Sequence, residues 1–368
     1  MSERRIRVLL LFGGRSAEHD VSRVTAVAVA SALDPGKYDV VPVSITTDGR
    51  WLLADDASAL LAGARDALPS AFEVAGTPVA PSADPTRAEI VSSSGPAFAV
   101  DVVLPLLHGP YGEDGTVQGL LELAGLPYVG AGVLASALGM DKIAMKRAFT
   151  ACGLPQAAYR TLRDGHDVGE FVTLVEHELG YPCFVKPANM GSSVGVSKAR
   201  DAAELEAAIA TAFEYDEWLV AEEAVVGREI EVAVLGDDPP LASRAGEIVP
   251  ADDFYSYADK YETGAAQLLI PAPLDDVAET AVRSLAVRAF EACRGEAMAR
   301  VDFFYETGGP ARGFLINELN TIPGFTPVSM YPKLWAATGL AYDALVDRLI
   351  ELAIARHARR EKRAGRQR

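Results

Sequence analysis

The sequence predicts a multidomain protein of mixed α/β and α+β class that begins with a doubly wound parallel sheet. Its 368 residues exceed what a single hydrophobic core usually organises, so two or three domains are expected. The first 44 residues show the β-turn-α-β order that starts a parallel sheet. Near the C-terminus, two strand-like runs within residues 299–320 flank a Gly/Pro-rich segment, which predicts an antiparallel hairpin.

Residues 1–135 form the predicted N-terminal domain. Its expected elements are a strand at 6–12, a Gly-Gly turn, a helix at 17–33, strands at 40–44 and 102–107, and a helix at 117–124. Residues 54–99 have weak periodicity and are interpreted as surface elaboration without an assigned function. The apolar strand at 102–107 runs into a glycine-rich loop that begins at His108, and open α/β sheets place ligands at such carboxyl ends of strands.

Two further domains are predicted, at 136–236 and 237–368. Asp141 is the expected N-cap of a helix ending near residue 151. The central unit then continues with strands at 158–162, 183–186, 218–225 and 229–235 and helices at 168–179 and 202–213. The last domain has a polar loop at 250–266, a helix at 274–293, the hairpin, and a final helix starting near 342.

Composition excludes several classes of partner. The formal net charge of -17 opposes broad adhesion to nucleic acids or anionic membranes, which are held by clustered Lys and Arg. The basic end, residues 356–368, fits a nucleic-acid arm or, as favoured here, a frayed helix end with cations at the negative pole of the dipole. The three cysteines are widely spaced and indicate buried thiols, not disulfides or zinc ligands. No signal-peptide core or membrane-spanning run is recognisable, so an intracellular protein is expected.

The hairpin carries a candidate metal site. Glu318 and Asn320 lie two residues apart on a strand, so their side chains point the same way. Folding back of the preceding strand is expected to set Asp302 roughly opposite Asn317, beside Glu318. Oxygen ligands of this kind suit Mg²⁺, which also keeps waters and substrate phosphates. The sequence therefore predicts a magnesium-nucleotide site.

Other segments could bind a nucleotide, although each has a plainer explanation. The loop at 186–195 begins with Lys186 and is rich in Gly and Ser, which lets backbone N–H groups approach phosphate; alone, it fits an ordinary hairpin loop better. Lys142 opposes the dipole of its helix, which hints at an anionic ligand, but a solvated lysine is the favoured interpretation. Glu222 and Glu229 could accept ribose hydroxyls, or could simply keep an edge strand soluble.

Taken together, these segments resemble the ATP-grasp family and, within it, the D-alanine–D-alanine ligases. The matching motifs, in order, are residues 13–22, the His108 loop, 140–142, 186–193, 255–261, 299–302 and 317–324. They cover nearly the whole chain apart from residues 54–99 and the basic tail. The resemblance implies an ATP-grasp fold behind an N-terminal pre-ATP-grasp domain.

The resemblance also implies how ATP is held. Lys142 and Lys186 would contact the phosphates while Ser193 and its loop close over them. The strand that carries Glu222, Glu223 and Val225 would take the adenine, and Glu229 the ribose hydroxyls. Asp302, Glu318 and Asn320 would hold two Mg²⁺ ions, for which Mn²⁺ can substitute.

For the substrates, the resemblance assigns Glu18 to the ammonium of the first D-alanine, linked by hydrogen bonds to Ser192 and Tyr261. Arg300 and the N–H of Gly324 would bind the oxyanion. Ser329 and Met330, with Lys260, would bind the carboxylate of the second substrate, and His108 would lie near the phosphates or the first substrate. Without the resemblance, Glu18 would be interpreted as an acid at a helix N-terminus, Arg300 as a partner of Asp302, and His108 as structural.

The implied activity is ATP-dependent joining of two D-alanines through a D-alanyl phosphate, for peptidoglycan precursors. Tyr261 favours D-alanine as the second substrate, because Phe at this position goes with D-lactate in the family. A D-alanine–D-lactate or D-alanine–D-serine ligase, another ATP-grasp enzyme and an inactive nucleotide-binding protein are the alternatives. The expected setting is a cytoplasmic homodimer that binds D-alanine and ATP, with neither nucleic acid nor membrane as a partner.

Overall fold

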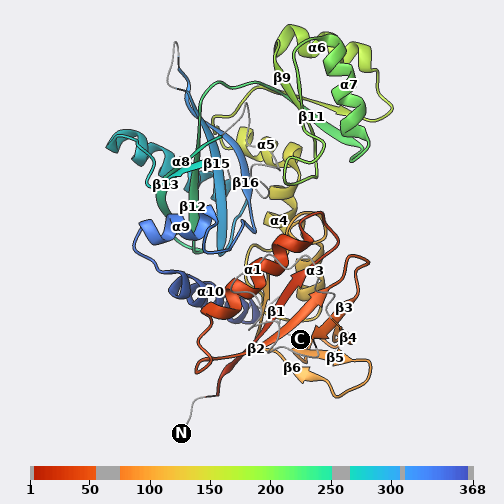
Figure 1. The fold of residues 1–368 in the computed structure, drawn as a ribbon, viewed down its shortest axis with the longest axis vertical. Coiled ribbons are helices and arrows are strands. Elements are labelled where there is room, and N and C mark those ends of the chain that lie inside the picture. The colour runs from red at the N-terminus through yellow and green to blue at the C-terminus, as the bar shows by residue number, and fades with distance from the viewer. Residues whose placement is uncertain (1–3, 55–74, 251–265, 307–310, 364–368) are drawn as a thin grey trace.

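The computed structural model describes residues 4–54, 75–250, 266–306 and 311–363. Three sheets organise them: one of seven strands, one of four and one of five. Figure 1 shows the seven-stranded sheet at one end of the long axis and the four-stranded sheet at the other, with the five-stranded sheet between them. The predicted α/β and α+β multidomain class is confirmed.

The N-terminal unit has a mixed sheet. Its elements are β1 (Ile6–Gly13), α1 (His19–Ala32), β2 (Tyr38–Ile45), β3 (Trp51–Ala54), β4 (Gly76–Pro81), β5 (Glu89–Ser92), β6 (Phe98–Ala99), β7 (Val102–Pro105), α3 (Thr116–Leu123) and α4 (Val133–Met140). Strand β1 pairs in parallel with β2 and β7, as predicted. The interpretation of residues 54–99 as mere elaboration is corrected, because β3 to β6 extend the sheet with antiparallel pairs. Short, partly exposed strands such as β4, which contains two prolines, lack a clear apolar alternation.

Helices cover both faces of this sheet because its side chains alternate. Val8, Leu10 and Phe12 of β1 are buried in one core cluster with residues of α1 and α10 (Tyr342–Glu361). Leu9 and Leu11 point the other way and join a second cluster with residues of α3. The first cluster also includes residues of α9 (Met330–Ala337) and of the five-stranded sheet, so the first and last units share a core.

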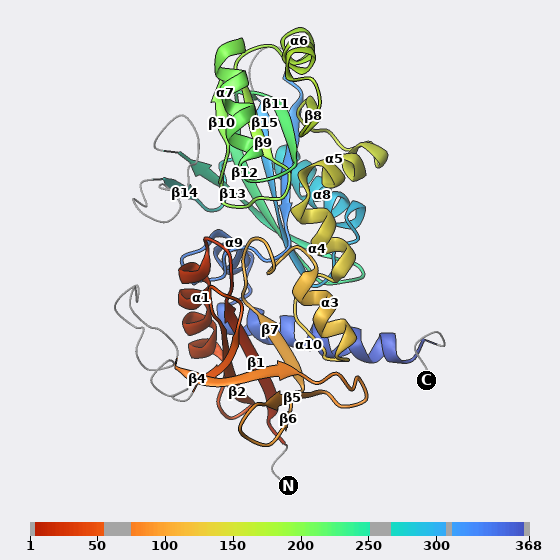
Figure 2. The same ribbon diagram turned by 90° about the vertical axis from the view of Figure 1, so that its right-hand side faces the viewer.

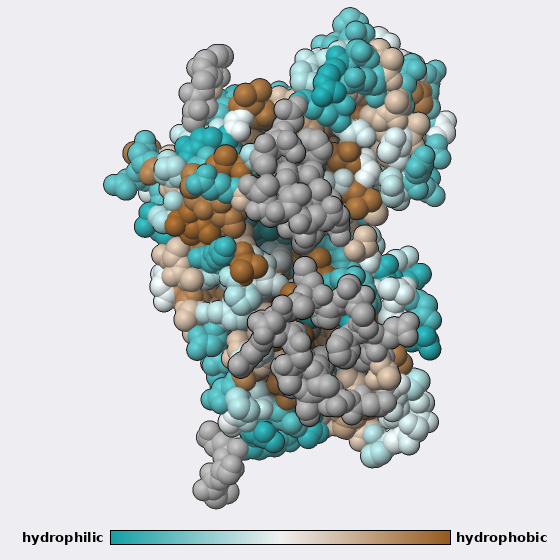
Figure 3. All heavy atoms as spheres, in the orientation of Figure 1, coloured by the Kyte–Doolittle hydropathy of each residue, from teal (hydrophilic) through white to brown (hydrophobic). Residues whose placement is uncertain are grey.

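The central unit has its own core. Helix α5 (Lys142–Ala151) leads into it, and Asp141 accepts a hydrogen bond from the N–H of Ala144, which confirms the predicted N-cap. The unit comprises β8 (Tyr159–Arg163), α6 (Val168–Glu178), β9 (Cys183–Pro187), β10 (Ser197–Ala199), α7 (Ala202–Phe213) and β11 (Trp218–Glu223), with sheet order β10-β9-β11-β8. Helices α6 and α7 bury their apolar faces in this core. Figure 3 shows mainly hydrophilic residues where the outer surface of this unit faces the viewer.

The last unit is an antiparallel sheet covered by α8 (Asp276–Ala292). Its strands are β12 (Arg228–Leu235), β13 (Leu241–Val249), β14 (Gln267–Leu269), β15 (Met298–Glu306) and β16 (Gly313–Asn320), in the order β14-β13-β12-β15-β16. The strand predicted at 229–235 was expected to complete the central unit, but β12 pairs with β13 and β15 instead. The apolar pattern of β12 suits either sheet, so only the tertiary pairing decides which sheet contains this strand. The residue limits of the three predicted domains stay predictions.

The described part of the basic C-terminal segment, residues 356–363, does not fit the favoured interpretation of a frayed helix end. Helix α10 continues to Glu361 and lies beside the N-terminal unit (Figure 2). Arg356 is 3% exposed and donates to the carbonyl oxygens of Tyr128 and Gly130, each at 2.6 Å. Arg360 pairs with Glu122 at 2.6 Å and with Glu296 at 2.7 Å. These arginines fasten the helix to the first unit.

Two further expectations concern the burial of the cysteines and the presence of membrane-spanning segments. Cys183 and Cys293 are buried, as expected, but Cys152 is exposed at the end of α5. In the described ranges, no helix has both the length and the apolar character needed to cross a membrane.

The buried position of Arg356 generates a stability prediction. Arg356→Met leaves two buried carbonyl oxygens without their donor. We therefore expect the free energy of unfolding to fall by about 2–4 kcal/mol, measured as a lower midpoint of urea unfolding. Arg363→Met is the control, because Arg363 is exposed just beyond the same helix. Equal midpoints for the two variants would contradict the fastening role.

Candidate active site

A large cavity lies between the four-stranded and five-stranded sheets. Its volume is about 550 Å³, within the range of small-molecule sites. Strands β9, β11, β12, β15 and β16 line it, together with the loop that follows β9. Both sheets therefore contribute side chains to one enclosed space.

The predicted hairpin is confirmed as β15 and β16, with one correction of register. Asp302 lies opposite Glu318, and Arg300 opposite Asn320. Asn317 was expected opposite Asp302, but a bulge after this pair sets Phe303 opposite Ile316 and leaves Asn317 as the extra residue. Glu231 of β12 lies opposite Asp302 on its other side, so three carboxylates form one row across three strands.

Asp302 is the centre of a polar cluster. Arg300 donates to its two carboxylate oxygens at 2.7 and 2.6 Å, and Asn320 Nδ2 lies 3.0 Å from it. Arg300 also lies 3.1 Å from Glu231. Burial alone would lower the pKa of Arg300, but Asp302 and Glu231 raise it well above its usual value. The guanidinium thus stays charged and is held in one orientation.

The donor set on this face fits a hard divalent cation. Asp302 and Glu318 supply carboxylate oxygens and Asn320 an amide oxygen, the ligand types that Mg²⁺ prefers. The described ranges contain no group of three or more His, Cys, Asp or Glu side chains suited to a metal. Such a partial set matches Mg²⁺, which commonly takes its remaining ligands from water and substrate phosphates.

Two lysines with proposed phosphate roles reach the same cavity. Lys186 Nζ lies 2.7 Å from Glu222 Oε2 and 3.4 Å from Asn317 Oδ1. Burial alone would lower its pKa, but Glu222 raises it overall. Lys142 Nζ donates to the carbonyl oxygen of Met190 at 2.5 Å, and burial lowers its pKa despite the charge of Glu318. Both amines face the hairpin with its carboxylates.

The segment predicted to bind adenine also lines the cavity, through Glu222, Glu223, Val225 and Glu229. The side chain of Glu222, however, is fully engaged with lysines. Glu223 accepts from the backbone N–H of Ala158 and from Arg312, each at 2.6 Å.

Glu18 and Ser192 meet although 174 residues separate them. Ser192 Oγ donates to Glu18 Oε1 at 2.5 Å, and Glu18 is 8% exposed. Ser192 and Ser193 have φ values of 50° and 59°, a left-handed conformation that turns the loop after β9. This contact joins the loop to the N-terminal unit just before α1.

His108, Gly324, Ser329 and Met330 gather beside the end of β16, outside the lining of the large cavity. His108 is buried and its Nδ1 lies 3.0 Å from the carbonyl oxygen of Ile322. Ser329 Oγ lies 2.8 Å from Thr326 Oγ1. A Cβ atom added to Gly324 would lie 3.1 Å from Ser329 Oγ, so Gly324 and Ser329 are close neighbours. Met330 is buried at the start of α9. Lys260 and Tyr261 lie outside the described residues.

Sequence reasoning missed three charged residues of the site. Glu231 follows Glu229 by two residues, so strand periodicity could have placed it on the same face. Lys146 follows Lys142 by four residues on α5, one helical turn. Glu113 lines the cavity, and its carboxylate accepts a hydrogen bond from the N–H of Gly109 at 2.8 Å. Burial and, to a smaller extent, the charge of Glu18 raise the pKa of Glu113 to about 8.

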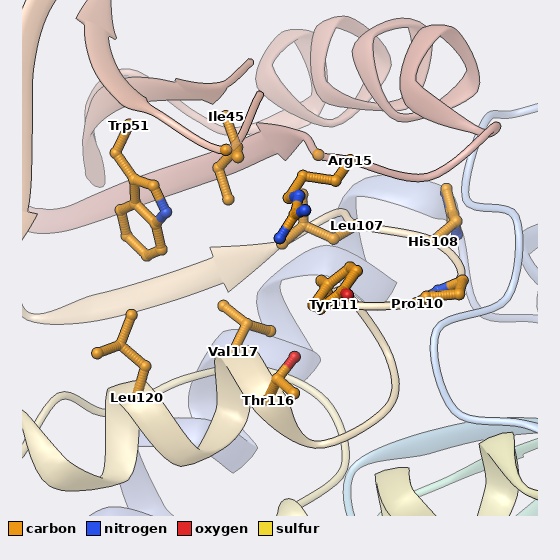
Figure 4. A pocket seen from close by; sticks show the side chains of 13 residues that line it. Arg15, Ile45, Trp51, Leu107, His108, Pro110, Tyr111, Thr116, Val117 and Leu120 are labelled. Carbon is orange, nitrogen blue, oxygen red and sulfur yellow. The ribbon is translucent and has the colours of Figure 1, made fainter. Parts of the chain in front are cut away.

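A smaller cavity of about 180 Å³ opens in the N-terminal unit (Figure 4). Trp51, Val117 and Leu120 give it apolar walls, and the Arg15 guanidinium carbon lies 4.4 Å from the centre of the Tyr111 ring. None of the described residues lining it is a carboxylate. It therefore lacks the cation ligands that the large cavity has.

Comparisons with known proteins give consistent matches. The family described as D-ala D-ala ligase N-terminus matches residues 7–131, and the one described as D-ala D-ala ligase C-terminus matches residues 148–351. A D-alanine–D-alanine ligase of Geobacillus thermodenitrificans is 47% identical over 358 residues, covering 96% of this chain and 97% of the relative. A relative of the same name from Mycolicibacterium paratuberculosis is 47% identical over 369 residues, covering 96% and 98%.

Solved structures agree with these matches. The D-alanine-D-alanine ligase of Coxiella burnetii superposes with a TM-score of 0.85 at 36% identity, covering 97% of this chain and 96% of that one. The VanG D-Ala:D-Ser ligase of Enterococcus faecalis superposes with a TM-score of 0.84 at 34% identity, covering 95% and 100%.

Proposed function

Because this chain belongs to the D-alanine–D-alanine ligase family, we propose how its side chains share the work of an ATP-dependent ligation. The enzyme joins two D-alanines to D-alanyl-D-alanine for peptidoglycan synthesis. The observation that carries the proposed roles is the convergence of Lys142, Lys186 and the β15–β16 carboxylates on one cavity.

The cavity is proposed to hold ATP. Lys142 and Lys186 bind its phosphates, Ser193 closes over them, and the stretch from Glu223 to Glu229 takes the adenine and ribose. The amines are positioned for this role because Met190, Glu222 and Asn317 hold them at the cavity wall. Buried charges on fixed side chains interact with phosphate more strongly than charges in water do.

Asp302, Glu318 and Asn320 are proposed to hold magnesium, with manganese as a substitute. When bound, the metal would offset the negative charge on the transferred phosphoryl group. Arg300 orients Asp302 through its paired hydrogen bonds. The pairing of Asp302 opposite Glu318, with Asn320 two residues further along the same strand, supports this assignment.

The first D-alanine is proposed to place its ammonium at Glu18, which Ser192 orients. Its carboxylate attacks the γ-phosphorus of ATP, so ADP leaves and D-alanyl phosphate forms. His108, fixed against Ile322, lies beside this substrate. The buried position of Glu18 excludes water and strengthens its attraction for the ammonium.

The amine of the second D-alanine then attacks the acyl carbon, and inorganic phosphate leaves. Arg300 and the backbone N–H of Gly324 are proposed to stabilise the oxyanion of the tetrahedral intermediate. Ser329 and Met330 are proposed to receive the second carboxylate, with Lys260 assisting and Tyr261 joining Glu18 and Ser192. The proximity of Gly324 to Ser329 supports placing the oxyanion and the second substrate side by side.

A D-alanine–D-serine ligase is the second candidate, because a protein of that name superposes over 95% of this chain. The higher identity to D-alanine–D-alanine ligases favours D-alanine as the second substrate.

We also propose a cytoplasmic homodimer. Leu123 and Leu134, 78% and 49% exposed on α3 and α4, offer an apolar contact surface for a second copy. Sedimentation at the mass of one 39.0 kDa chain would contradict the dimer.

The substrate assignment predicts the outcome of an assay. Purified protein should release phosphate from ATP when D-alanine is added, and mass spectrometry should identify D-alanyl-D-alanine as the product. Parallel reactions contain D-alanine with D-lactate or with D-serine. A mixed product exceeding the dipeptide would move the enzyme to the corresponding alternative, and no D-alanine-dependent release would defeat the proposal.

The metal assignment predicts the effect of one isosteric change. Glu318→Gln should lower kcat by about 100-fold or more, since an amide is a poorer ligand and carries no charge to balance the cation. The unfolding midpoint should stay close to that of the wild type. Glu306→Gln is the matched control, because Glu306 stands on the same hairpin and pairs with Arg312 at 2.7 Å. Near-normal turnover in Glu318→Gln would remove this residue from the metal site.

A further inference from the structure

Lys146 is a buried cation that does not reach the ATP cavity. It lies on α5, is 1% exposed, and is absent from the residues that line the cavity. Removing a charged amine from water is costly unless a partner compensates, and an apolar side chain of similar size would pack without that cost. The charge of Lys146 therefore calls for an explanation beyond packing.

The partner of Lys146 is Glu222. Lys146 Nζ lies 2.8 Å from Glu222 Oε1, while Lys186 Nζ lies 2.7 Å from Glu222 Oε2. Glu222 is 3% exposed, so little solvent screens either contact. Burial alone would raise the pKa of Glu222, but Lys146 and then Lys186 outweigh it and lower the pKa to about 2. Glu222 is consequently ionised at neutral pH.

The three side chains carry two positive charges and one negative charge. Glu222 alone would neutralise Lys186 and compete with any anion for its amine. With Lys146 on the opposite carboxylate oxygen, the group keeps one net positive charge. Glu222 and Lys186 both line the cavity, and of the two lysines Lys186 is the one that does so. The Tyr159 ring, 5.3 Å from Lys146 Nζ, adds a favourable contact for this second cation.

We propose that Lys146 is a positioning residue that neutralises Glu222 and thereby leaves the charge of Lys186 available to the ATP phosphates. The inference rests on the proposed role of Lys186 in binding those phosphates. It also assigns Glu222 a role as the fixed bridge between the two lysines, in place of a side-chain contact with adenine. Lys146 acts through Glu222 and touches no substrate.

Charge counting makes the inference distinguishable from a merely structural role. In Lys146→Met, Glu222 and Lys186 form a neutral pair, so the phosphates lose an attractive charge. In Lys146→Met/Glu222→Gln, the carboxylate charge is also gone, and Lys186 regains its full charge. A binding defect caused by lost packing around Lys146 would persist in the double variant, because the Lys146 side chain is still missing, whereas a defect caused by the uncompensated charge of Glu222 would be reversed.

The test measures binding of the non-hydrolysable analogue AMP-PNP by calorimetry in the presence of Mg²⁺. Lys146→Met should raise its Kd about tenfold, equivalent to the loss of one partly screened charge contact. The KM for D-alanine should change little, because in the described ranges Lys146 pairs with Glu222 and not with Glu18, Ser329 or Met330. The double variant should bind within about threefold of the wild type. Arg147→Met, at the next and exposed position of α5, is the control for the helix.

Two results would overturn the inference: a wild-type Kd for Lys146→Met, or a double variant that binds no better than Lys146→Met. If Lys146→Met does not fold, the double variant still decides, since it lacks the unpaired Glu222 carboxylate and its remaining charge, that of Lys186, lines the cavity; tenfold weaker binding would contradict the proposal. Lys186→Met tests the premise that Lys186 binds the phosphates. Unchanged AMP-PNP binding in that variant would defeat the phosphate role of Lys186 itself. Weaker binding in Lys186→Met together with wild-type binding in Lys146→Met would leave that role standing and reject only the inference about Lys146.

Discussion

The active site depends on the ion pairs of Glu222. Its carboxylate joins Lys146 of α5 to Lys186 of β9, and Lys186 reaches on to Asn317 of β16. One buried anion thus connects the central unit to the five-stranded sheet across the cavity. Charges so deeply buried must be paired, and pairing restricts where each element can lie. The same arrangement leaves a net positive charge facing a space lined by carboxylates, where a polyphosphate and its cation can both be accommodated.

The N-terminal unit completes the site because it is packed rigidly against the last unit. Their shared core and the arginines of α10 hold β1 and β7 beside the end of β16. His108 consequently contacts Ile322. The central unit is different, since its core is separate and its loop reaches the N-terminal unit through Ser192 and Glu18. Under the proposed assignments, the residues for the amino-acid substrates lie beside the core that the first and last units share, and those for ATP lie between the central unit and the last unit.

Charge placement, not total charge, explains how this strongly acidic protein can bind an anionic nucleotide. The overall charge of -17 concerns the surface at large and disfavours extended polyanions. Inside the cavity, Lys186 and Arg300 have carboxylate partners, and Lys142 donates to the carbonyl oxygen of Met190. Local geometry therefore governs ligand choice, and the exposed surface governs solubility.

Much of the architecture could be predicted from local patterns. The first strands and helix, the Asp141 cap and the β15–β16 hairpin follow from periodicity and turn residues, and these signals act over a few neighbouring residues. Elements with weak signals were missed: β4 to β6 are short strands at one end of the seven-stranded sheet, and α4, α9 and β13 were not anticipated. The bulge opposite Asp302 shifted the expected register by one residue, because strand alternation alone does not reveal an inserted residue.

The sequence by itself determined which reactive side chains this protein can offer. The order of its motifs and the residue types at Glu18, Lys186, Asp302 and Glu318 predict sites for a nucleotide, a cation and an amino-acid ammonium. Only the tertiary structure decided which charges neutralise one another. The association of β12 with the last sheet, the meeting of Glu18 with Ser192 and the placement of Glu222 between two lysines all join distant segments. Such contacts depend on packing and burial in three dimensions, which no local sequence pattern records.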